Sequence, residues 1–341
     1  MAITINGSGT VTGLSVGGLP DGTVDSGTLA TDSVTAVKIP DTVESSLKSG
    51  RKNLIINGGF DVWQRGTSFS SPTSNTYLAD RWSAVVQSAT VSKESITDLP
   101  GFSSALKLTT GATDPYFVQK VEGTYFRGQT MTFSFWVKGD IPPHTMFYDY
   151  TNTFSAQTPI LIDTVGAWKR YSNTYVLPTT APTQDYLTLR IDLAESSSSI
   201  QYLTGVQAEL GSVATDFEHR SYGEELALCH RYYQYYGQLR FTLMYGQFAD
   251  TGGVWSPSWS YPNGTMRANP TAVYEDLVGN VGKMTVLNVL NNTNTNNINA
   301  RPFALHPSAI YFNTYAEAVG MTVLGQSAIG KVENFSLDAE L

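Results

Sequence analysis

Between residues 89 and 210 the sequence is divided into short segments of alternating or compact apolar residues, each bounded by Gly, Pro, Ser or Asp. A period of two places apolar side chains on one face of a strand, and the bounding residues favour turns. The segments are 89–96, 105–111, 116–123, 131–139, 169–177, 186–194 and 199–210. Short strands at this spacing predict two packed antiparallel sheets. We therefore expect an all-β fold with a jelly-roll β-sandwich in residues 51–217.

The composition supports an all-β chain and excludes several functions. Charged residues make up only 15% of the sequence and aromatic residues reach 12% with 19 Tyr, which is typical of strands joined by many turns. The formal net charge is −8, and no cluster of Lys and Arg is present, so we expect no nucleic-acid partner. A single cysteine, Cys229, excludes an intrachain disulfide framework. No apolar run approaches the roughly 20 residues of a membrane helix, so we expect no membrane insertion.

Residues 1–50 contain a five-residue repeat in which one apolar residue is followed by Gly, Asp, Ser or Thr. The repeat positions are Leu19, Val24, Leu29, Val34 and Ile39. One apolar residue in five cannot build a monomeric core. The segment is either a disordered linker or an extended strand that buries these residues against copies of itself. The regular period favours the second interpretation, an extended N-terminal stalk that packs against copies of itself in a fibrous oligomer.

A helical pattern follows the sandwich segments. Ser221 and Glu224 form a capping box, and four apolar or aromatic residues recur on one helical face over 221–236. These four are Leu226, Cys229, Tyr233 and Tyr236. We expect a short connecting helix within residues 218–238. Residues 239–341 return to strand patterns, end on a closing strand at 331–341, and predict a β-rich C-terminal head.

Four stretches of the chain resemble a known group of proteins. They are 53–69 (NLIINGGFDVWQRGTSF), 77–82 (YLADRW), 131–139 (MTFSFWVKG) and 206–233 (VQAELGSVATDFEHRSYGEELALCHRYY). They look like bacteriophage tail-fibre and receptor-binding proteins that carry a carbohydrate-binding-module-like jelly roll. The SLDAEL ending also occurs in such chains. The resemblance covers roughly residues 50–236 and is weaker at both ends.

The resemblance implies a homotrimeric appendage of the virion tail, assembled in the host cytoplasm. Residues 1–50 would then attach to the phage tail, baseplate or an adaptor protein, and the ligand would be a host surface glycan.

The pattern of residues 52–69 predicts a strand, then a turn at Asn57, Gly58 and Gly59, and a core residue at Phe60.

Asp61 and Glu209 are candidate ligands of a structural calcium ion. In related sugar-binding jelly rolls, calcium often ties the first strand to the last through carboxylate and main-chain oxygens, which are the hard ligands it requires. The alternative is that Asp61 caps a turn and Glu209 is exposed. Apart from this possible calcium, we expect no cofactor.

Trp63 and Trp82 are candidate glycan-binding residues because charged residues accompany them. The charged residues are Arg65, Asp80 and Arg81. An aromatic ring covers the apolar face of a sugar while planar polar groups bond its hydroxyls. The alternative, which we favour, is structural: the tryptophans hold the sandwich together, and Arg81 forms a buried pair with Asp80 or Asp61.

Three further aromatic residues are candidate receptor contacts. Trp255, Trp259 and Tyr261 lie among Ser, Pro and Gly with little alternation, which predicts loops with exposed aromatic side chains. The alternative is a strand packed in the head or at a trimer axis. The Asn-rich tract 291–299 predicts either a mobile tip or a hydrogen-bonding surface for glycans.

Catalysis finds little support in the sequence. A glycosidase needs two carboxyl groups that face each other across a cleft, and the Asp and Glu pairs here are only adjacent in sequence. We therefore expect a non-enzymatic virion structural protein, a tail fibre or adhesin that binds host surface glycans multivalently. The alternatives are a tailspike depolymerase that cleaves surface polysaccharide and a capsid-surface decoration protein.

Overall fold

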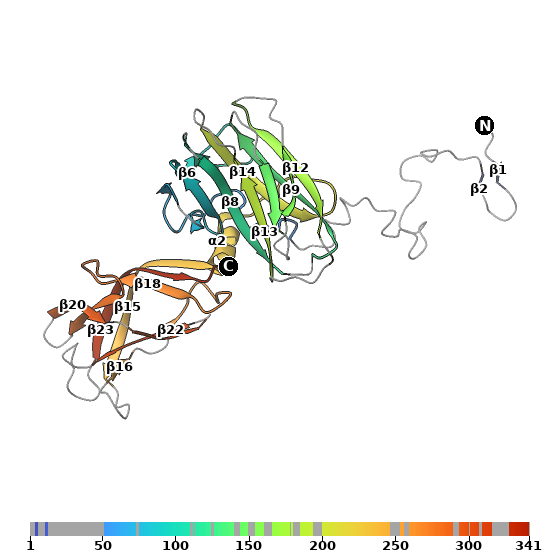
Figure 1. Cartoon of the computed structure of the whole chain (residues 1–341). Helices are drawn as coiled ribbons and strands as arrows, with labels where there is room; N and C mark the ends of the chain where they lie inside the picture. The colour runs from blue at the N-terminus through green and yellow to red at the C-terminus, as the bar shows by residue number, and fades with distance from the viewer. Residues whose placement is uncertain are drawn as a thin grey trace. The chain divides into compact units, whose positions relative to one another are not determined.

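The chain divides into two compact units, residues 1–50 and 51–341 (Figure 1). The computed structural model describes residues 4–5, 11–12 and 51–340, the last range with gaps at 73–74, 110, 112, 124–125, 140–143, 149–153, 160–165, 178, 180–184, 194–199, 246–252, 256–258, 289–292, 300, 307–308 and 316–326. In the first unit, β1 (Thr4–Ile5) pairs antiparallel with β2 (Val11–Thr12). The apolar repeat of residues 19–39 lies outside the described residues, so the stalk and the trimer stay predictions.

Two six-stranded antiparallel sheets form a sandwich between residues 68 and 210. The first sheet has the order β11 (Phe154–Pro159), β10 (His144–Tyr148), β13 (Tyr186–Asp192), β8 (Thr113–Glu122), β5 (Ser83–Gln87) and β4 (Thr76–Tyr77). The second has the order β12 (Lys169–Val176), β9 (Thr130–Lys138), β14 (Gln201–Leu210), β7 (Ser104–Leu108), β6 (Thr90–Ser95) and β3 (Ser68–Ser70). All seven strands expected from the sequence are present, which confirms the all-β sandwich.

The main core lies between these two sheets. In β13, Leu187, Leu189 and Ile191 are buried in it, and in β9 Phe133 and Phe135 are buried in the same cluster. Because side chains alternate along a strand, the residues between them face away from the core. Full burial of each of these large apolar side chains contributes about 1.5–3 kcal/mol.

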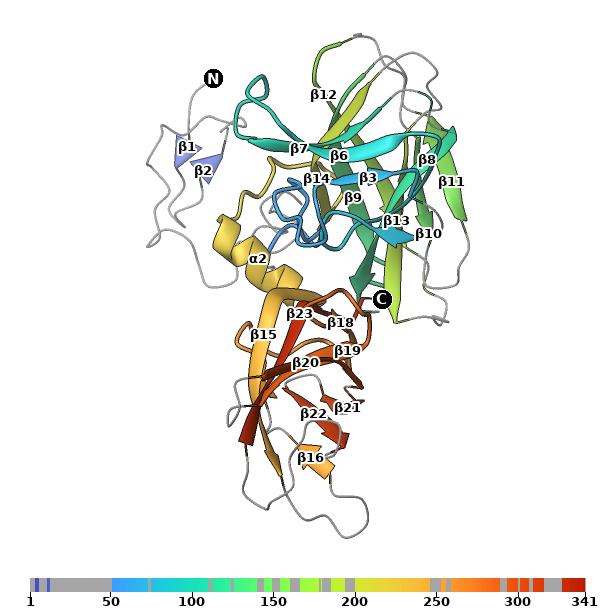
Figure 2. The same ribbon diagram turned by 90° about the vertical axis from the view of Figure 1, so that its left-hand side faces the viewer.

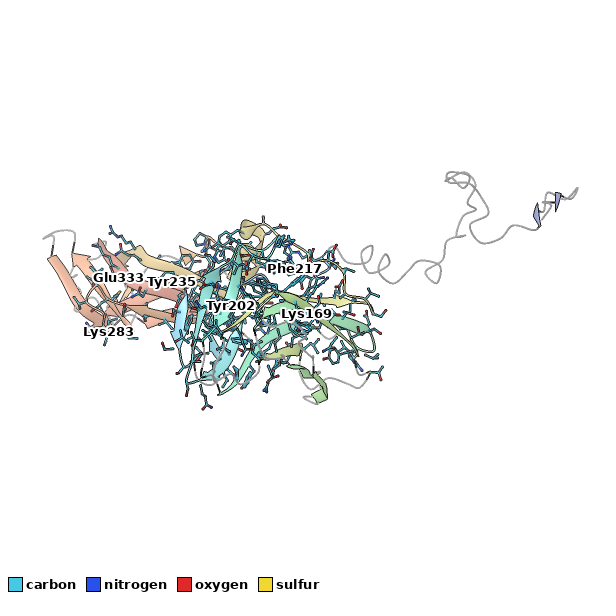
Figure 3. The ribbon with its side chains drawn as sticks, turned by 90° about the horizontal axis from the view of Figure 1, so that it is seen from above. Lys169, Tyr202, Phe217, Tyr235, Lys283 and Glu333 are labelled. Atoms are coloured by element: carbon cyan, nitrogen blue, oxygen red, sulfur yellow. The ribbon has the colours of Figure 1, made fainter. Side chains whose placement is uncertain are left out.

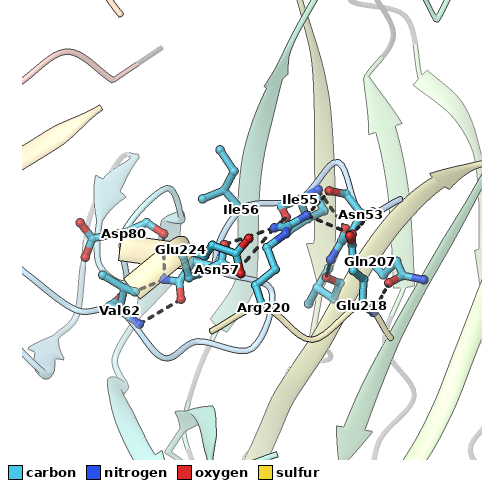
Figure 4. A network of polar contacts seen from close by, with 12 residues as sticks. Asn53, Ile55, Ile56, Asn57, Val62, Asp80, Gln207, Glu218, Arg220 and Glu224 are labelled. Carbon is cyan, nitrogen blue, oxygen red and sulfur yellow. Dashed lines mark hydrogen bonds and ion pairs between the residues drawn. The ribbon is translucent and has the colours of Figure 1, made fainter. Parts of the chain in front are cut away.

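Residues 51–67 contain no strand, so the strand expected at 52–56 is wrong. Side chains satisfy this segment's backbone instead, as buried N–H and C=O groups require. Asn53 Oδ1 accepts hydrogen bonds from the Ile55 and Ala208 amides at 2.9 and 3.1 Å, and Arg220 Nη1 donates to the Ile55 oxygen at 3.0 Å (Figure 4). Gln119 bonds both backbone groups of Ile56 at 2.8 Å.

The expected glycine turn is confirmed. The Phe60 amide donates to the Asn57 oxygen at 3.2 Å, and Asn57 has a φ of 58°. A Cβ atom at Gly58 would lie 2.1 Å from the main-chain oxygen of Val206, so only glycine fits there. Phe60 is fully buried, as expected.

The connecting helix α2 (Tyr222–His230) begins at the expected capping box, in which Ser221 accepts from the Glu224 amide and Glu224 reaches back to the Ser221 amide. It ends six residues earlier than the pattern predicts. Tyr233 and Tyr236 belong to strand β15 (Tyr233–Tyr245), which pairs with β23 (Ser327–Asp338). The expected helical face therefore stops at Cys229, which is fully buried.

The C-terminal part forms a nine-stranded antiparallel sheet (Figure 2). Its order is β17 (Trp259–Ser260), β22 (Ala309–Tyr315), β16 (Gly253–Trp255), β15, β23, β19 (Lys283–Asn288) and β20 (Thr293–Asn299), with β18 (Thr271–Glu275) on β23 and β21 (Arg301–His306) on β22. The expected closing strand is confirmed as part of β23. Most of the Asn-rich tract forms β20, which pairs with β19, so it is not an unpaired tip.

In the described part of the chain, no helix combines the length and apolarity of a membrane span.

Candidate functional site

The outward surface of β8 and β13 carries aromatic and charged side chains in register. Leu187, Leu189 and Ile191 enter the core, so the alternate residues of β13 face outward. Paired residues of antiparallel strands share a face. The outward pairs are Tyr186 with Glu122, Thr188 with Lys120, Arg190 with Val118 and Asp192 with Tyr116. We call these eight residues the β8–β13 face.

Contacts along the β8–β13 face hold its polar groups in fixed positions. The Arg190 guanidinium carbon lies 3.8 Å from the Tyr116 ring centroid, and Arg190 Nε donates to Asp192 Oδ1 at 2.9 Å. Lys120 Nζ lies 4.6 Å from the Tyr186 ring centroid. The Arg190 and Asp192 side chains are 18% and 17% exposed. Aromatic rings and oriented donors and acceptors thus lie together on this surface, as they do in sugar-binding sites.

The corresponding surface of the second sheet is covered by its own chain. Thr132 and Ser134 of β9, with Gln207 and Glu209 of β14, face away from the main core and are nevertheless buried. Segment 211–220 contributes to this cover: the rings of Phe217 and Phe102 are in contact at a tilt of 51°, with their centroids 5.0 Å apart. Phe217 and Tyr202 are labelled in Figure 3. The buried side chains of this surface are therefore not available to a ligand.

An open groove of about 610 Å³ lies at the Glu122 end of the β8–β13 face. Glu122 receives hydrogen bonds from Arg231 Nη1 at 2.5 Å and from Arg267 Nε at 2.7 Å. Burial alone would raise the pKa of Glu122, but the hydrogen bonds and charges of the two arginines hold that pKa below its ordinary value. Other lining residues include Leu54, Asp185 and Tyr232. We call this the Glu122 groove.

The arginines expected near Trp63 and Trp82 form a buried cluster with the end of the chain. Arg81 makes an ion pair with Glu340, and its guanidinium carbon lies 3.4 Å from the Tyr232 ring centroid. Arg65 Nη2 donates to Asp338 at 3.0 Å. The guanidinium carbon of Arg65 lies 3.6 Å from the Tyr233 ring centroid. The pairing of Arg81 with Asp80 or Asp61 is therefore wrong.

Sequence reasoning missed this arginine cluster because carboxylates that pair with Arg65 and Arg81 lie more than 250 residues away along the chain. The only available signal was the joint occurrence of the NGGFDVWQRG, YLADRW and SLDAEL motifs. The structure brings the three motifs together through Arg65, Arg81 and Glu340. They form a structural junction.

Trp82 and Trp63 have structural contacts. Trp82 is fully buried, its Nε1 donates to the Asn57 oxygen at 3.0 Å, and its ring lies 5.1 Å from that of Phe60. A glycan cannot reach it, so its assignment as a glycan-binding residue is wrong. Trp63 is half-buried against the core, and its Nε1 donates to the Phe60 oxygen at 2.7 Å.

Two of the three distal aromatic residues lie in strands, and Tyr261 directly follows β17. Trp255 ends β16 and Trp259 begins β17. Tyr261 is 5% exposed and its hydroxyl donates to the Ala309 oxygen at 3.0 Å. Burial raises the pKa of Tyr261 to about 12. Tyr261 is therefore a buried residue and not an exposed receptor contact. The side chains of Trp255 and Trp259 lie outside the described part of the structure.

The proposed calcium ligands have other partners. Both oxygens of Glu209 are engaged, Oε1 by the Thr215 amide at 2.9 Å and Oε2 by the Thr215 hydroxyl at 2.6 Å. Glu209 is buried, so the alternative expectation that it is exposed is wrong. Asp61 Oδ1 lies 3.5 Å from the Ser103 hydroxyl. Among the described residues, no three His, Cys, Asp or Glu side chains form a group that could hold a metal ion. The calcium site stays a prediction.

No protein-family model and no curated protein matches the chain. Solved structures similar to part of it include the enzymatically active domain of tailspike protein 4 from Bacteriophage CBA120, at 16% identity and a TM-score of 0.32 over 42% of this chain and 21% of that one. A CBM4 structure matches at 17% identity and a TM-score of 0.32, over 46% of this chain and 98% of that one. TmCBM61, solved in complex with beta-1,4-galactotriose, matches at 12% identity and a TM-score of 0.32, over 47% and 100%. At these values the matches carry no argument about function.

Proposed function

We propose that this chain is a structural protein of a phage virion, a tail fibre or adhesin, that binds host surface glycans without cleaving them. The observation that carries the glycan-binding part is the β8–β13 face, with the Tyr116 ring beside Arg190 and Asp192. The virion part rests on the resemblance of the sequence motifs to phage receptor-binding proteins.

The β8–β13 face offers the two kinds of contact that a sugar needs. A tyrosine ring can cover the C–H groups of a pyranose, while Arg190 donates to hydroxyl oxygens and Asp192 accepts from hydroxyl protons. Arg190 is already oriented by Asp192 and Tyr116, so little side-chain entropy is lost on binding. In a trimer, three such sites would gain avidity because the second and third contacts are intramolecular.

The electrostatics of the Glu122 groove do not suit Glu122 as the general acid of a glycosidase. A glycosidase needs a carboxylic acid that is still protonated near neutral pH, and this requires a raised pKa. Glu122 has a lowered pKa because Arg231 and Arg267 outweigh the effect of burial. The carboxyl group therefore accepts hydrogen bonds as an anion and is not a proton donor.

The test is to screen the purified full-length chain against an array of neutral and acidic oligosaccharides. Binding of the best glycan is then measured by titration calorimetry for the wild type, Tyr116→Ala and Arg190→Gln. Each substitution should weaken binding about tenfold or more, since loss of a stacked ring or of a buried donor costs about 1.5–3 kcal/mol.

The matched controls are Tyr222→Ala and Arg240→Gln, which change exposed residues outside the sandwich. Both should bind like the wild type. Unchanged binding by Tyr116→Ala and Arg190→Gln, with circular dichroism showing intact folds, would exclude the β8–β13 face. Release of shortened glycan products would refute the non-catalytic assignment.

A further inference from the structure

The β8–β13 face leads into the Glu122 groove. Glu122 is the last outward residue of β8, opposite Tyr186 of β13, and it also lines the groove. A chain of sugars that lies along the face from Tyr116 toward Tyr186 therefore reaches Glu122 and its two arginines. The groove volume of about 610 Å³ lies within the range of small-ligand sites, which is roughly 300–1,000 Å³.

Two positive and two negative side chains line the groove, and both positive ones lie beside Glu122. Two guanidinium groups, Arg231 and Arg267, share the single carboxylate of Glu122. Asp185 also lines the groove; it is exposed, as is Arg231, so solvent screens both charges. Lys120, one outward position before Glu122 on β8, adds a further positive charge. The lowered pKa of Glu122 reflects the hydrogen bonds and charges of Arg231 and Arg267.

The arginines retain the capacity to bind an anion. A guanidinium carries five N–H donors, and Glu122 engages one nitrogen of each arginine, Nη1 of Arg231 and Nε of Arg267. The Arg231 and Arg267 side chains are 49% and 20% exposed. Planar guanidinium groups match the geometry of a carboxylate, which they bind through two parallel hydrogen bonds. Leu54 supplies an apolar wall for the C–H groups of a sugar ring.

We propose that the Glu122 groove binds a carboxylate-bearing sugar residue, such as a uronic acid, of the glycan that lies on the β8–β13 face. This inference rests on the proposed function and specifies its ligand. The sugar carboxylate receives hydrogen bonds from Arg231 and Arg267, while neighbouring neutral residues contact Tyr116, Arg190 and Asp192. The binding of the anion depends on the two arginines, and Glu122 competes with it for their donors.

The first experiment compares acidic oligosaccharides with their carboxyl-reduced forms, which are neutral and otherwise alike, on the full-length chain. We expect the acidic form of the best array glycan to bind about tenfold more tightly at low salt, with the difference shrinking as salt is added. Equal binding of the two forms, or a preference for phosphorylated sugars over carboxylated ones, would overturn the groove assignment and leave the proposed function standing. Binding to no glycan at all would overturn the proposed function, and the groove assignment with it.

Two substitutions with opposite expected effects separate ligand binding from a structural role. Arg267→Gln should remove most of the preference for the acidic form. Glu122→Gln should strengthen binding of the acidic form about threefold or more, because it removes the competing carboxylate. A purely structural role predicts that both substitutions weaken binding, and that result would contradict the proposal.

The control for these substitutions is Arg190→Gln, which should weaken the acidic and the neutral form by the same factor. If Arg267→Gln fails to fold, Glu122→Gln still decides the question, because Gln retains the size and the acceptor oxygen of the side chain. Unchanged or weaker binding of the acidic form by a folded Glu122→Gln variant would then refute the groove assignment.

Discussion

Arg81 has a left-handed backbone conformation, with φ at 71°, and its side chain is 1% exposed. Such a conformation costs about 1–3 kcal/mol in a residue other than glycine, so the surrounding structure has to stabilise it. The Trp82 amide donates to the Ala79 oxygen at 2.9 Å and fixes the turn, while Glu340 and Tyr232 hold the guanidinium.

At the scale of residues, Trp82 and Phe60 could be assigned to the core from the sequence. The partner of Arg81 could not, because no local pattern connects residues 259 positions apart.

Removal of Arg81 should be strongly destabilising. Arg81→Ala leaves the Glu340 carboxylate buried beside fewer cations, which costs about 3–5 kcal/mol in the free energy of unfolding. Urea denaturation of the wild type and the variant measures the effect, with Arg51→Ala as an exposed control. The double variant Arg81→Met and Glu340→Leu should lose less than the sum of the single changes. A loss below about 0.5 kcal/mol for Arg81→Ala would show that the ion pair does not stabilise the junction.

At the scale of elements, seven strands between residues 89 and 210 could be predicted because their alternation has a local cause, whereas β10 and β11 were not expected. The end of α2 could not be predicted. Tyr233 and Tyr236 fit helical spacing from Cys229, but residues 232–236 contain four tyrosines, which favour a strand. Pairing of β15 with β23, almost a hundred residues later, decides in favour of the strand.

The N-terminal end of α2 gives an element-scale prediction. Ser221→Ala removes the acceptor for the Glu224 amide and should lower the free energy of unfolding by about 1 kcal/mol. Ser221→Asp keeps an N-cap acceptor and should remain within a few tenths of the wild type. Thermal and urea denaturation of the two variants check this difference. Equal losses of stability in both variants would mean that the N-cap hydrogen bond does not stabilise the helix.

At the scale of the whole molecule, Glu122 connects the sandwich to Arg231 and Arg267, and this connection should depend on pH. The folded-state pKa of Glu122 lies below its ordinary value of 4.5, so the unfolded state binds more protons between the two values. The stabilisation is therefore present above about pH 4.5 and is lost as the pH falls through the folded-state pKa. Denaturation from pH 3 to 7 should show the advantage of the wild type over Glu122→Gln shrinking on the acidic side. A constant difference would contradict the ion pairs.

The location of the binding site could be predicted only in part. Residues 116–123 and 186–194 were expected as strands, so their outward residues could be read from the alternation. Their pairing could not, because β9 and β12, which lie between them in sequence, belong to the other sheet. The clustering of Trp255, Trp259 and Tyr261 among turn residues pointed to the head instead. Strands with sheet partners contain the two tryptophans, and Tyr261 is buried.

The most direct measurement is glycan binding by two double variants of the full-length chain, compared with the wild type on the same oligosaccharide by titration calorimetry. One variant combines Tyr116→Ala with Arg190→Gln on the β8–β13 face, and the other combines Trp255→Ala with Trp259→Ala in the head. We predict that the first variant loses at least about a hundredfold in affinity and that the second binds like the wild type. Loss of binding by the head variant, with the β8–β13 variant unaffected, would contradict a binding site on the sandwich.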